Sequence, residues 1–193
     1  WLDSRAKRQM DSILADYTPE QIYRITGKRA NEVYVLPKLL WIKEHEPEVY
    51  SKTYKFLTAH DFIMAKLCGE FATDHTLASG TLIYDISKQK WSQEIMDHVG
   101  LDADKLPDIK WSGTALGFIR EEVAAEIGVR KNVVVAVGGQ DQKCAALGAG
   151  IADGIVTVSL GTATALEMKW NYPVIDPKMR IPCFSDLIQN KWV

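Results

Sequence analysis

The chain has 193 residues, 47% of them hydrophobic and 25% charged, and a formal net charge of -2. This composition is typical of a globular domain, and the near-neutral charge argues against nucleic acid or an anionic membrane as a partner. No apolar run is long enough for a membrane-spanning helix, and the three cysteines are too scattered for a zinc site or a disulfide framework.

Scattered thiols of this kind are typical of a reducing cytoplasm, which is the location we expect. The four histidines have no metal-ligand spacing with acids or with one another, so we predict no metal site built by these residues. The sequence starts at Trp1 without a methionine and ends without a polar tail. We therefore expect it to be an internal piece of a longer protein.

The first half of the chain carries helical signals. Apolar residues recur at helical spacing over residues 3–17, and further helices are predicted over residues 37–46, 58–67 and 92–100. Thr58 and Asp61 are spaced as a capping box, and Gly69 is a natural C-terminal stop for the same helix.

The second half mixes strands with helices. A helix is predicted over residues 118–127, and the run NVVVAV at 132–137 is typical of a strand buried on both faces. A short helix over 143–148 follows, and then two strands over 154–160 and 164–168. This order indicates an α/β or α+β layered domain, with a boundary near 148–154, where glycines and small residues cluster.

The strongest candidate for chemistry is Asp141, in the segment VVVAVGGQDQ. It follows a predicted strand and two glycines, and ligands of α/β sheets bind beyond the carboxyl ends of strands. The glycines would let a substrate approach closely, and a carboxylate here can accept a proton from a hydroxyl nucleophile. The alternative is that Asp141 only caps the following helix, and the pattern alone leaves both interpretations open.

Two other segments carry weaker signals. Gly161-Thr162 joins the last two predicted strands, and such a turn either binds phosphate oxygens or is only a hairpin turn. It is not a P-loop, because GxxxxGK[ST] does not occur in the sequence. Trp1, Asp3 and Arg5 would suit a polyol, but a capped helix start with Asp3 as its N-cap explains them equally well.

The segments of the chain, taken in order, resemble the FGGY family of carbohydrate kinases, with features of its xylulokinase-like and glycerol-kinase-like members. The matching segments are WLDSR, KLLWIKEHEPEVY, FLTAHDFIMAKLCGEFATDHTLASGTLIYD, KQKWSQEIMDHVGL with KLPDI, VVVAVGGQDQKCAALGAG and GIVTVSLGTATAL. The resemblance implies an α/β fold of two actin-like, RNase-H-like ATPase domains with a cleft between them. Residues 1–150 would be the N-terminal, sugar-binding domain without its own N-terminal segment. Residues 151–193 would be the truncated start of the C-terminal, ATP-binding domain.

The resemblance also implies roles for particular residues. Asp141 would be the general base toward the hydroxyl that is phosphorylated, and Trp1, Gln142 and Tyr34 would contact the substrate. Gly161 and Thr162 would contact the phosphates of ATP.

The family implies ATP and Mg²⁺ as co-substrate and cofactor, a sugar or polyol as substrate, and a homodimer in the full-length protein. We favour a pentulose such as xylulose. The family segment that contacts metal and phosphate would precede Trp1 and the adenosine site would follow Val193, so we expect this piece alone to be inactive. The alternative is a non-catalytic relative of the actin-like superfamily that binds sugar or nucleotide without transfer.

Overall fold

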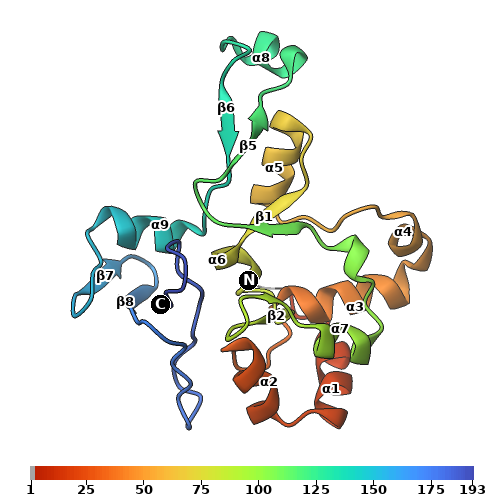
Figure 1. The fold of residues 1–193 in the computed structure, drawn as a ribbon. Helices are drawn as coiled ribbons and strands as arrows, with labels where there is room; N and C mark the ends of the chain where they lie inside the picture. The colour runs from red at the N-terminus through yellow and green to blue at the C-terminus, as the bar shows by residue number, and fades with distance from the viewer. Residues whose placement is uncertain (1–2) are drawn as a thin grey trace.

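A computed structural model describes residues 3–193, in which helices and short strands alternate along the chain (Figure 1). The helices are α1 (Lys7–Asp16), α2 (Pro19–Thr26), α3 (Val35–His45), α4 (Pro47–Lys52), α5 (Ala59–Cys68), α6 (His75–Ala78), α7 (Gln93–Val99), α8 (Glu121–Ile127) and α9 (Asp141–Gly148). The strands are β1 (Ala72–Asp74), β2 (Tyr84–Asp85), β3 (Lys90–Trp91), β4 (Asp108–Lys110), β5 (Ala115–Phe118), β6 (Val134–Ala136), β7 (Val156–Leu160) and β8 (Thr164–Met168). None of the helices in this described part is long and apolar enough to cross a membrane.

The strands of residues 3–193 pair two by two. β1 and β4 are parallel, whereas β2–β3, β5–β6 and β7–β8 are antiparallel. In Figure 1, β1 lies at the centre, with the helices α1, α2, α3 and α7 on one side and the hairpin β7–β8 with α9 on the other. The mixture of parallel and antiparallel pairs agrees with the predicted layered α/β architecture.

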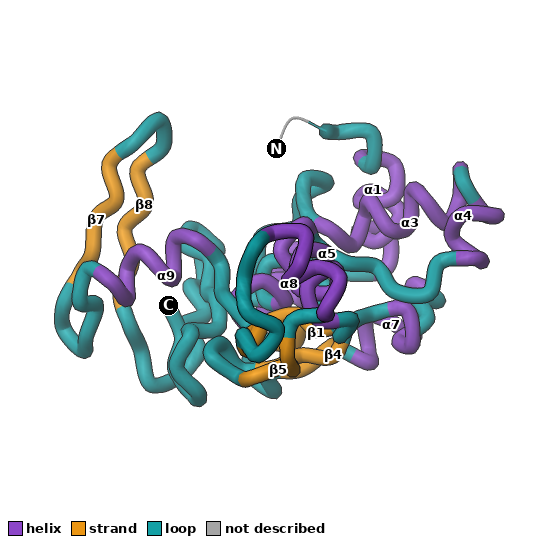
Figure 2. Tube along the Cα trace, turned by 90° about the horizontal axis from the view of Figure 1, so that it is seen from above, coloured by secondary structure: helices purple, strands orange, loops and turns teal. Residues whose placement is uncertain are grey.

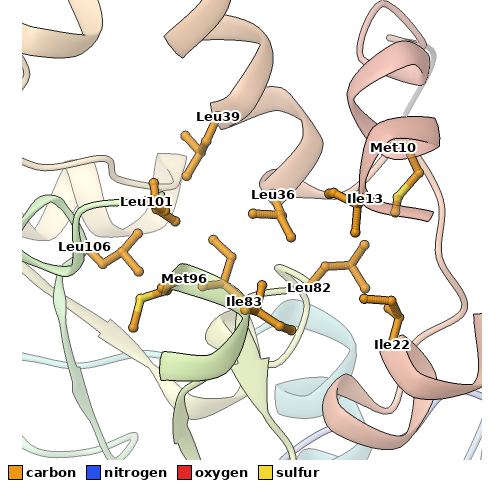
Figure 3. Packing of buried hydrophobic residues seen from close by; sticks show 11 residues of the cluster. Met10, Ile13, Ile22, Leu36, Leu39, Leu82, Ile83, Met96, Leu101 and Leu106 are labelled. Carbon is orange, nitrogen blue, oxygen red and sulfur yellow. The ribbon is translucent and has the colours of Figure 1, made fainter. Parts of the chain in front are cut away.

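The main hydrophobic core lies between α1, α2, α3, α7 and the chain that precedes β2. Apolar side chains from these segments point toward one another in Figure 3. Ile83 and Ile95 are completely buried, and Leu36 is 1% exposed. The buried members are Met10, Ile13, Ile22, Leu36, Leu39, Leu82, Ile83, Ile95, Met96, Leu101 and Leu106. Burying this many aliphatic side chains is the main driving force for folding of this half.

The predicted helix signals of the first half are confirmed, except at the first helix. Thr58 and Asp61 form the capping box of α5, and Gly69 ends that helix in the left-handed conformation at φ 86°. Ser92 caps α7 through the backbone N–H of Ile95. The first helix begins at Lys7 rather than at residue 3, because Asp3 accepts hydrogen bonds from Arg5 instead of capping the helix. The prediction of Asp3 as an N-cap was therefore wrong.

Two predictions in the second half need correction. The strand in NVVVAV covers only Val134–Ala136, and it is not buried on both faces: Val135 is 8% exposed, whereas Val134 is 51% exposed. Among the described residues the strand pairs with β5 alone. Its Val135 side packs with Ala124 of α8 and with Leu67 and Cys68 of α5, whereas Val134 faces outward. The helix predicted from residue 118 begins at Glu121, because Phe118 pairs with Val134 in the β5–β6 sheet.

The last segment of the chain returns to the first part. Cys183 and Trp192 are buried in a second core cluster with Tyr84 and Ile86, and the indole of Trp192 donates to the backbone oxygen of Ile86 (2.8 Å). Lys28 is also completely buried here, and its Nζ donates to the backbone oxygen of Cys183. Residues 183–192 thus pack against segments of the first hundred residues. The domain boundary near residue 150 stays a prediction.

Candidate active site

Asp141 lies at the start of α9, directly after the turn that follows β6. It is solvent-exposed, and its Oδ1 accepts a hydrogen bond from the backbone N–H of Gln142 (2.7 Å). The N-cap of α9 is Gln140, whose side chain accepts from the backbone N–H of Lys143 (3.2 Å). Asp141 is therefore not the cap that the alternative interpretation expected. Its carboxylate is available to a ligand in the solvent beside the first turn of α9.

The two glycines before Gln140 allow other groups to lie close to the backbone of the turn. In the structure these groups are side chains of the protein itself. A β-carbon at Gly139 would lie 2.2 Å from Cδ2 of Leu187, and one at Gly138 would lie 2.5 Å from Nε2 of His60. Contacts this short are incompatible with any larger residue unless the neighbours move. The glycines thus fix how the turn packs, whereas the sequence had suggested that they admit a substrate.

The backbone of the turn is tied to a buried polar cluster around Asp74. The N–H of Gln140 donates to the hydroxyl of Thr76 (2.8 Å), and Thr76 in turn donates to the carboxylate of Asp74. Asp74 also caps α6 by accepting hydrogen bonds from the backbone N–H groups of Thr76 and Leu77. Thr76 carries no local signal of this role in the sequence, because the hydrogen bond joins residues 64 positions apart.

Gln142 lines a cavity of about 210 Å³ between α9 and the hairpin β7–β8. The cavity also contains the hydroxyl residues Thr157 and Ser159 of β7 and the carboxyl residue Glu167 of β8. Gln142 therefore projects toward the hairpin, where it can offer both a donor and an acceptor to a hydroxyl-rich ligand.

A buried ion pair joins α9 to the same hairpin. The ammonium of Lys143 donates to the carboxylate of Glu167, and their side chains are only 6% and 8% exposed. The ring of Phe184 lies 4.3 Å from the Lys143 ammonium, as in a cation–π contact. This pair fixes the hairpin against the helix that carries Asp141, and the sequence analysis did not anticipate it.

Gly161 and Thr162 form the connection between β7 and β8, as predicted. The connection is exposed, and Figure 2 shows it at the free end of the hairpin, which projects beyond α9. The N–H of Gly161 donates to the backbone oxygen of Ala163 (3.2 Å), so this donor is used inside the turn. Any phosphate contact would have to use the Thr162 hydroxyl or other backbone groups of the turn.

The remaining predicted contact residues lie elsewhere. Tyr34 precedes α3, is half-buried and packs against the main core, and burial raises the pKa of its hydroxyl. Trp1 lies outside the described residues, so its predicted contact stays a prediction. In the same segment, Arg5 forms an ion pair with Asp3 that holds the pKa of that carboxyl well below its usual range, and its guanidinium lies 4.9 Å from the ring of Trp41.

Within residues 3–193, no group of three or more His, Cys, Asp or Glu side chains is arranged to hold a metal ion. His75, for example, is a core residue: it stacks on Trp111 with 3.7 Å between the ring centroids, and its Nδ1 lies 2.7 Å from the hydroxyl of Tyr84.

The burial of His75 predicts acid sensitivity. Burial lowers its pKa to about 4, whereas a histidine in an unfolded chain titrates near 6.5. Between these two pH values the unfolded chain binds a proton that the folded chain does not, so the free energy of unfolding falls as the pH is lowered from 6.5 to 4. We expect this group to contribute a loss of roughly 3 kcal/mol across that window and no pH dependence above it.

Urea denaturation of the wild type and of His75→Asn at several pH values measures this contribution. The variant is expected to lose less stability than the wild type between pH 6.5 and 4, because its side chain does not titrate. Identical pH profiles of the two proteins would contradict the assignment.

Comparison with known proteins by sequence identifies the family of the chain. Residues 1–148 match the family model for the FGGY family of carbohydrate kinases, N-terminal domain. The chain is 37% identical over 189 residues to a xylulose kinase of Lactococcus lactis, covering 97% of this chain and 37% of that protein. It is 32% identical over 185 residues to an autoinducer-2 kinase of Klebsiella pneumoniae, covering 93% of this chain and 34% of that protein.

Comparison of the structure with solved structures also points to sugar kinases. The chain superposes on the ligand-bound xylulose kinase of Lactobacillus acidophilus with a TM-score of 0.90 and 26% identity, covering 98% of this chain and 39% of that one. The fold is therefore that of the actin-like ATPases, as the sequence resemblance implied. The chain spans about a third of the length of the curated relatives it matches.

Proposed function

The chain belongs to the FGGY family of carbohydrate kinases, and we propose that the full-length protein transfers the terminal phosphoryl group of ATP to a hydroxyl group of a sugar. The observation that supports this proposal best is the exposed carboxylate of Asp141 at the N-terminus of α9. It lies beyond the carboxyl end of β6, the place where ligands of α/β folds bind.

In the proposed mechanism, Asp141 acts as the general base. Its carboxylate accepts a hydrogen bond from the sugar hydroxyl, orients the oxygen toward the phosphorus and takes the proton as the new bond forms. Phosphoryl transfer needs positioning and charge neutralisation more than covalent help from the protein, so a single well-placed carboxylate suffices for this step. The N–H of Gln142 donates to one oxygen of this carboxylate, which leaves the other oxygen for the sugar hydroxyl.

Gln142 would bind other hydroxyls of the same sugar. Its place in the cavity beside Thr157 and Ser159 supports this role, because the lining offers several donors and acceptors and Gln142 directly follows Asp141 in the chain. Trp1 and Tyr34 remain proposed substrate contacts. Tyr34 is half-buried and packs against the main core, so its contact with a sugar would use the exposed part of its side chain.

The exposed turn at Gly161-Thr162 is proposed to contact the phosphates of ATP. The Thr162 hydroxyl fits this role better than the N–H of Gly161, which is used within the turn. Mg²⁺ bound to nucleotide phosphates needs few protein ligands. The proposal therefore does not require a metal-binding group of three or more His, Cys, Asp or Glu side chains, and residues 3–193 contain none. When bound, Mg²⁺ would neutralise charge on the phosphates.

We propose a pentulose such as xylulose as the substrate, because the names of several relatives, in sequence and in structure, are xylulose kinase. A homodimer and a cytoplasmic location of the full-length protein also stay proposals. So does the expectation that residues 1–193 alone have no turnover, since the whole protein is about three times as long in its relatives.

The test of this function is an ATP-dependent phosphorylation assay with the full-length protein and a panel of pentuloses, hexuloses, aldoses, gluconate and glycerol. We expect xylulose to give the highest kcat/KM. A higher kcat/KM for a sugar other than a pentulose would support the kinase proposal but contradict the proposal of a pentulose substrate. If no compound on the panel increased ADP formation above the rate without sugar, the kinase proposal itself would be contradicted.

A further inference from the structure

A fully buried carboxylate lies beside the turn that carries Asp141. Asp74 accepts hydrogen bonds from the backbone N–H groups of Thr76 (2.7 Å) and Leu77 (3.2 Å) and from the hydroxyls of Thr76 and Ser112 (3.3 Å for Ser112). Burial raises the pKa of this carboxyl, whereas the four donors around its two oxygens favour the ionised form, which can only accept.

This arrangement fixes the direction of the hydrogen bonds at Thr76. Its hydroxyl has one proton, and because Asp74 accepts that proton, only the lone pairs of the hydroxyl remain. The N–H of Gln140 donates to them across 2.8 Å. Thr76 is 0% exposed, so bulk water does not compete for this bond.

We infer that Thr76 is a positioning residue for the phosphoryl transfer, which holds Asp141 in place through the backbone N–H of Gln140. The inference rests on the proposed function, because it gives Thr76 a role only if Asp141 is the base. Gln140 immediately precedes Asp141 and caps its helix, so the bond from Thr76 fixes the backbone one residue from the carboxylate.

The expected effect follows from the geometry of proton transfer. A displacement of about 1 Å of a positioned catalytic group costs up to roughly a hundredfold in rate. Loss of the Thr76 hydroxyl leaves the N–H of Gln140 without its acceptor, which allows the turn to move. Because Thr76 is fully buried, it would not contact the sugar, and its substitution should change substrate affinity little.

The test compares Thr76→Val, which keeps the shape but removes the hydroxyl, with Thr76→Ser, which keeps the hydroxyl. In the full-length protein we expect Thr76→Val to lower kcat on the best sugar by about ten- to a hundredfold, with KM within about threefold of wild type. Thr76→Ser is expected to retain most of kcat. Hydrogen–deuterium exchange of the Gln140 amide should be faster in Thr76→Val and close to wild type in Thr76→Ser.

Ser112→Ala is the matched control, because it removes a hydrogen bond from the same Asp74 carboxylate without touching Gln140. We expect its kcat to stay within about threefold of wild type. An equal fall of kcat in Ser112→Ala and Thr76→Val would show a general effect of the cluster and overturn the inference. If Thr76→Val does not fold, Thr76→Cys, which has the size of serine but a weakly accepting sulfur, replaces it in the comparison with Thr76→Ser.

Two outcomes separate this inference from the proposed function. Wild-type kcat in Thr76→Val, together with an inactive Asp141→Asn, overturns the role of Thr76 and leaves the base in place. Wild-type turnover of Asp141→Asn overturns the proposed base itself, whatever the Thr76 variants show.

Discussion

Replacing Asp141 with asparagine in the full-length protein is expected to lower kcat for sugar phosphorylation by about a hundredfold to ten-thousandfold. Asparagine has nearly the same shape as aspartate but cannot take the proton of the sugar hydroxyl at neutral pH. Because Asp141 is exposed and its helix is capped by Gln140, the substitution should leave the fold intact. The measurement is steady-state kinetics with ATP and the best sugar, alongside a circular dichroism spectrum of both proteins.

Asp11→Asn is the matched control, since Asp11 is an exposed aspartate on α1, outside the candidate site. Its kinetics should equal those of the wild type. If Asp141→Asn kept the wild-type kcat while its fold was unchanged, Asp141 would not be the base. A change confined to KM would assign Asp141 to sugar binding instead of proton transfer.

Replacing Lys143 with methionine is expected to lower the free energy of unfolding by about 3–5 kcal/mol. The substitution leaves the carboxylate of Glu167 buried without its cation, and one oxygen of Glu167 already lacks a hydrogen-bond partner. A buried, unpaired charge is among the few changes that destabilise a protein this strongly. Urea denaturation followed by tryptophan fluorescence measures the loss.

Two further variants make this result specific to the buried pair. Lys131→Met breaks an ion pair with Glu121 whose side chains are 75% and 78% exposed, and it should change the free energy of unfolding by less than about 1 kcal/mol. The double variant Lys143→Met with Glu167→Met should recover much of the loss, because neither member of the pair is left buried without its partner. Equal losses in Lys143→Met and Lys131→Met would contradict the assignment.

Helix ends in the first half of the chain were predictable from the sequence because local signals determine them. The capping box of Thr58 and Asp61 and the left-handed Gly69 act within one turn of the helix that they limit. Each satisfies backbone groups that the helix itself leaves unpaired. No knowledge of the rest of the fold is needed to place them.

Burial of the strand β6 was not predictable in the same way. A run of β-branched residues shows that a strand is favoured, but it does not show which elements cover its faces. In the structure, Val135 packs with Ile119 and Ala124, whereas Val134 points to solvent. The burial of a strand depends on tertiary packing, which single residues do not encode.

In the candidate site, too, some features were predictable from local sequence and others depend on the folded chain. Asp141 could be proposed from its place after a strand and two glycines, and the comparisons establish the family but leave its role to experiment. The residues that hold its surroundings were not visible in the sequence, because their bonds span 64 positions for Thr76 and Gln140 and 24 for Lys143 and Glu167. Pairs at such separations become neighbours only through the folded chain.

The packing of Gly139 against Leu187 has an evolutionary consequence. A β-carbon at position 139 would lie 2.2 Å from the leucine side chain, so a larger residue fits there only if the Leu187 side chain moves away. A mutation of the glycine should be accepted more readily where position 187 carries a smaller side chain. The two positions should therefore drift together among descendants of this gene, even though neither needs to touch a ligand.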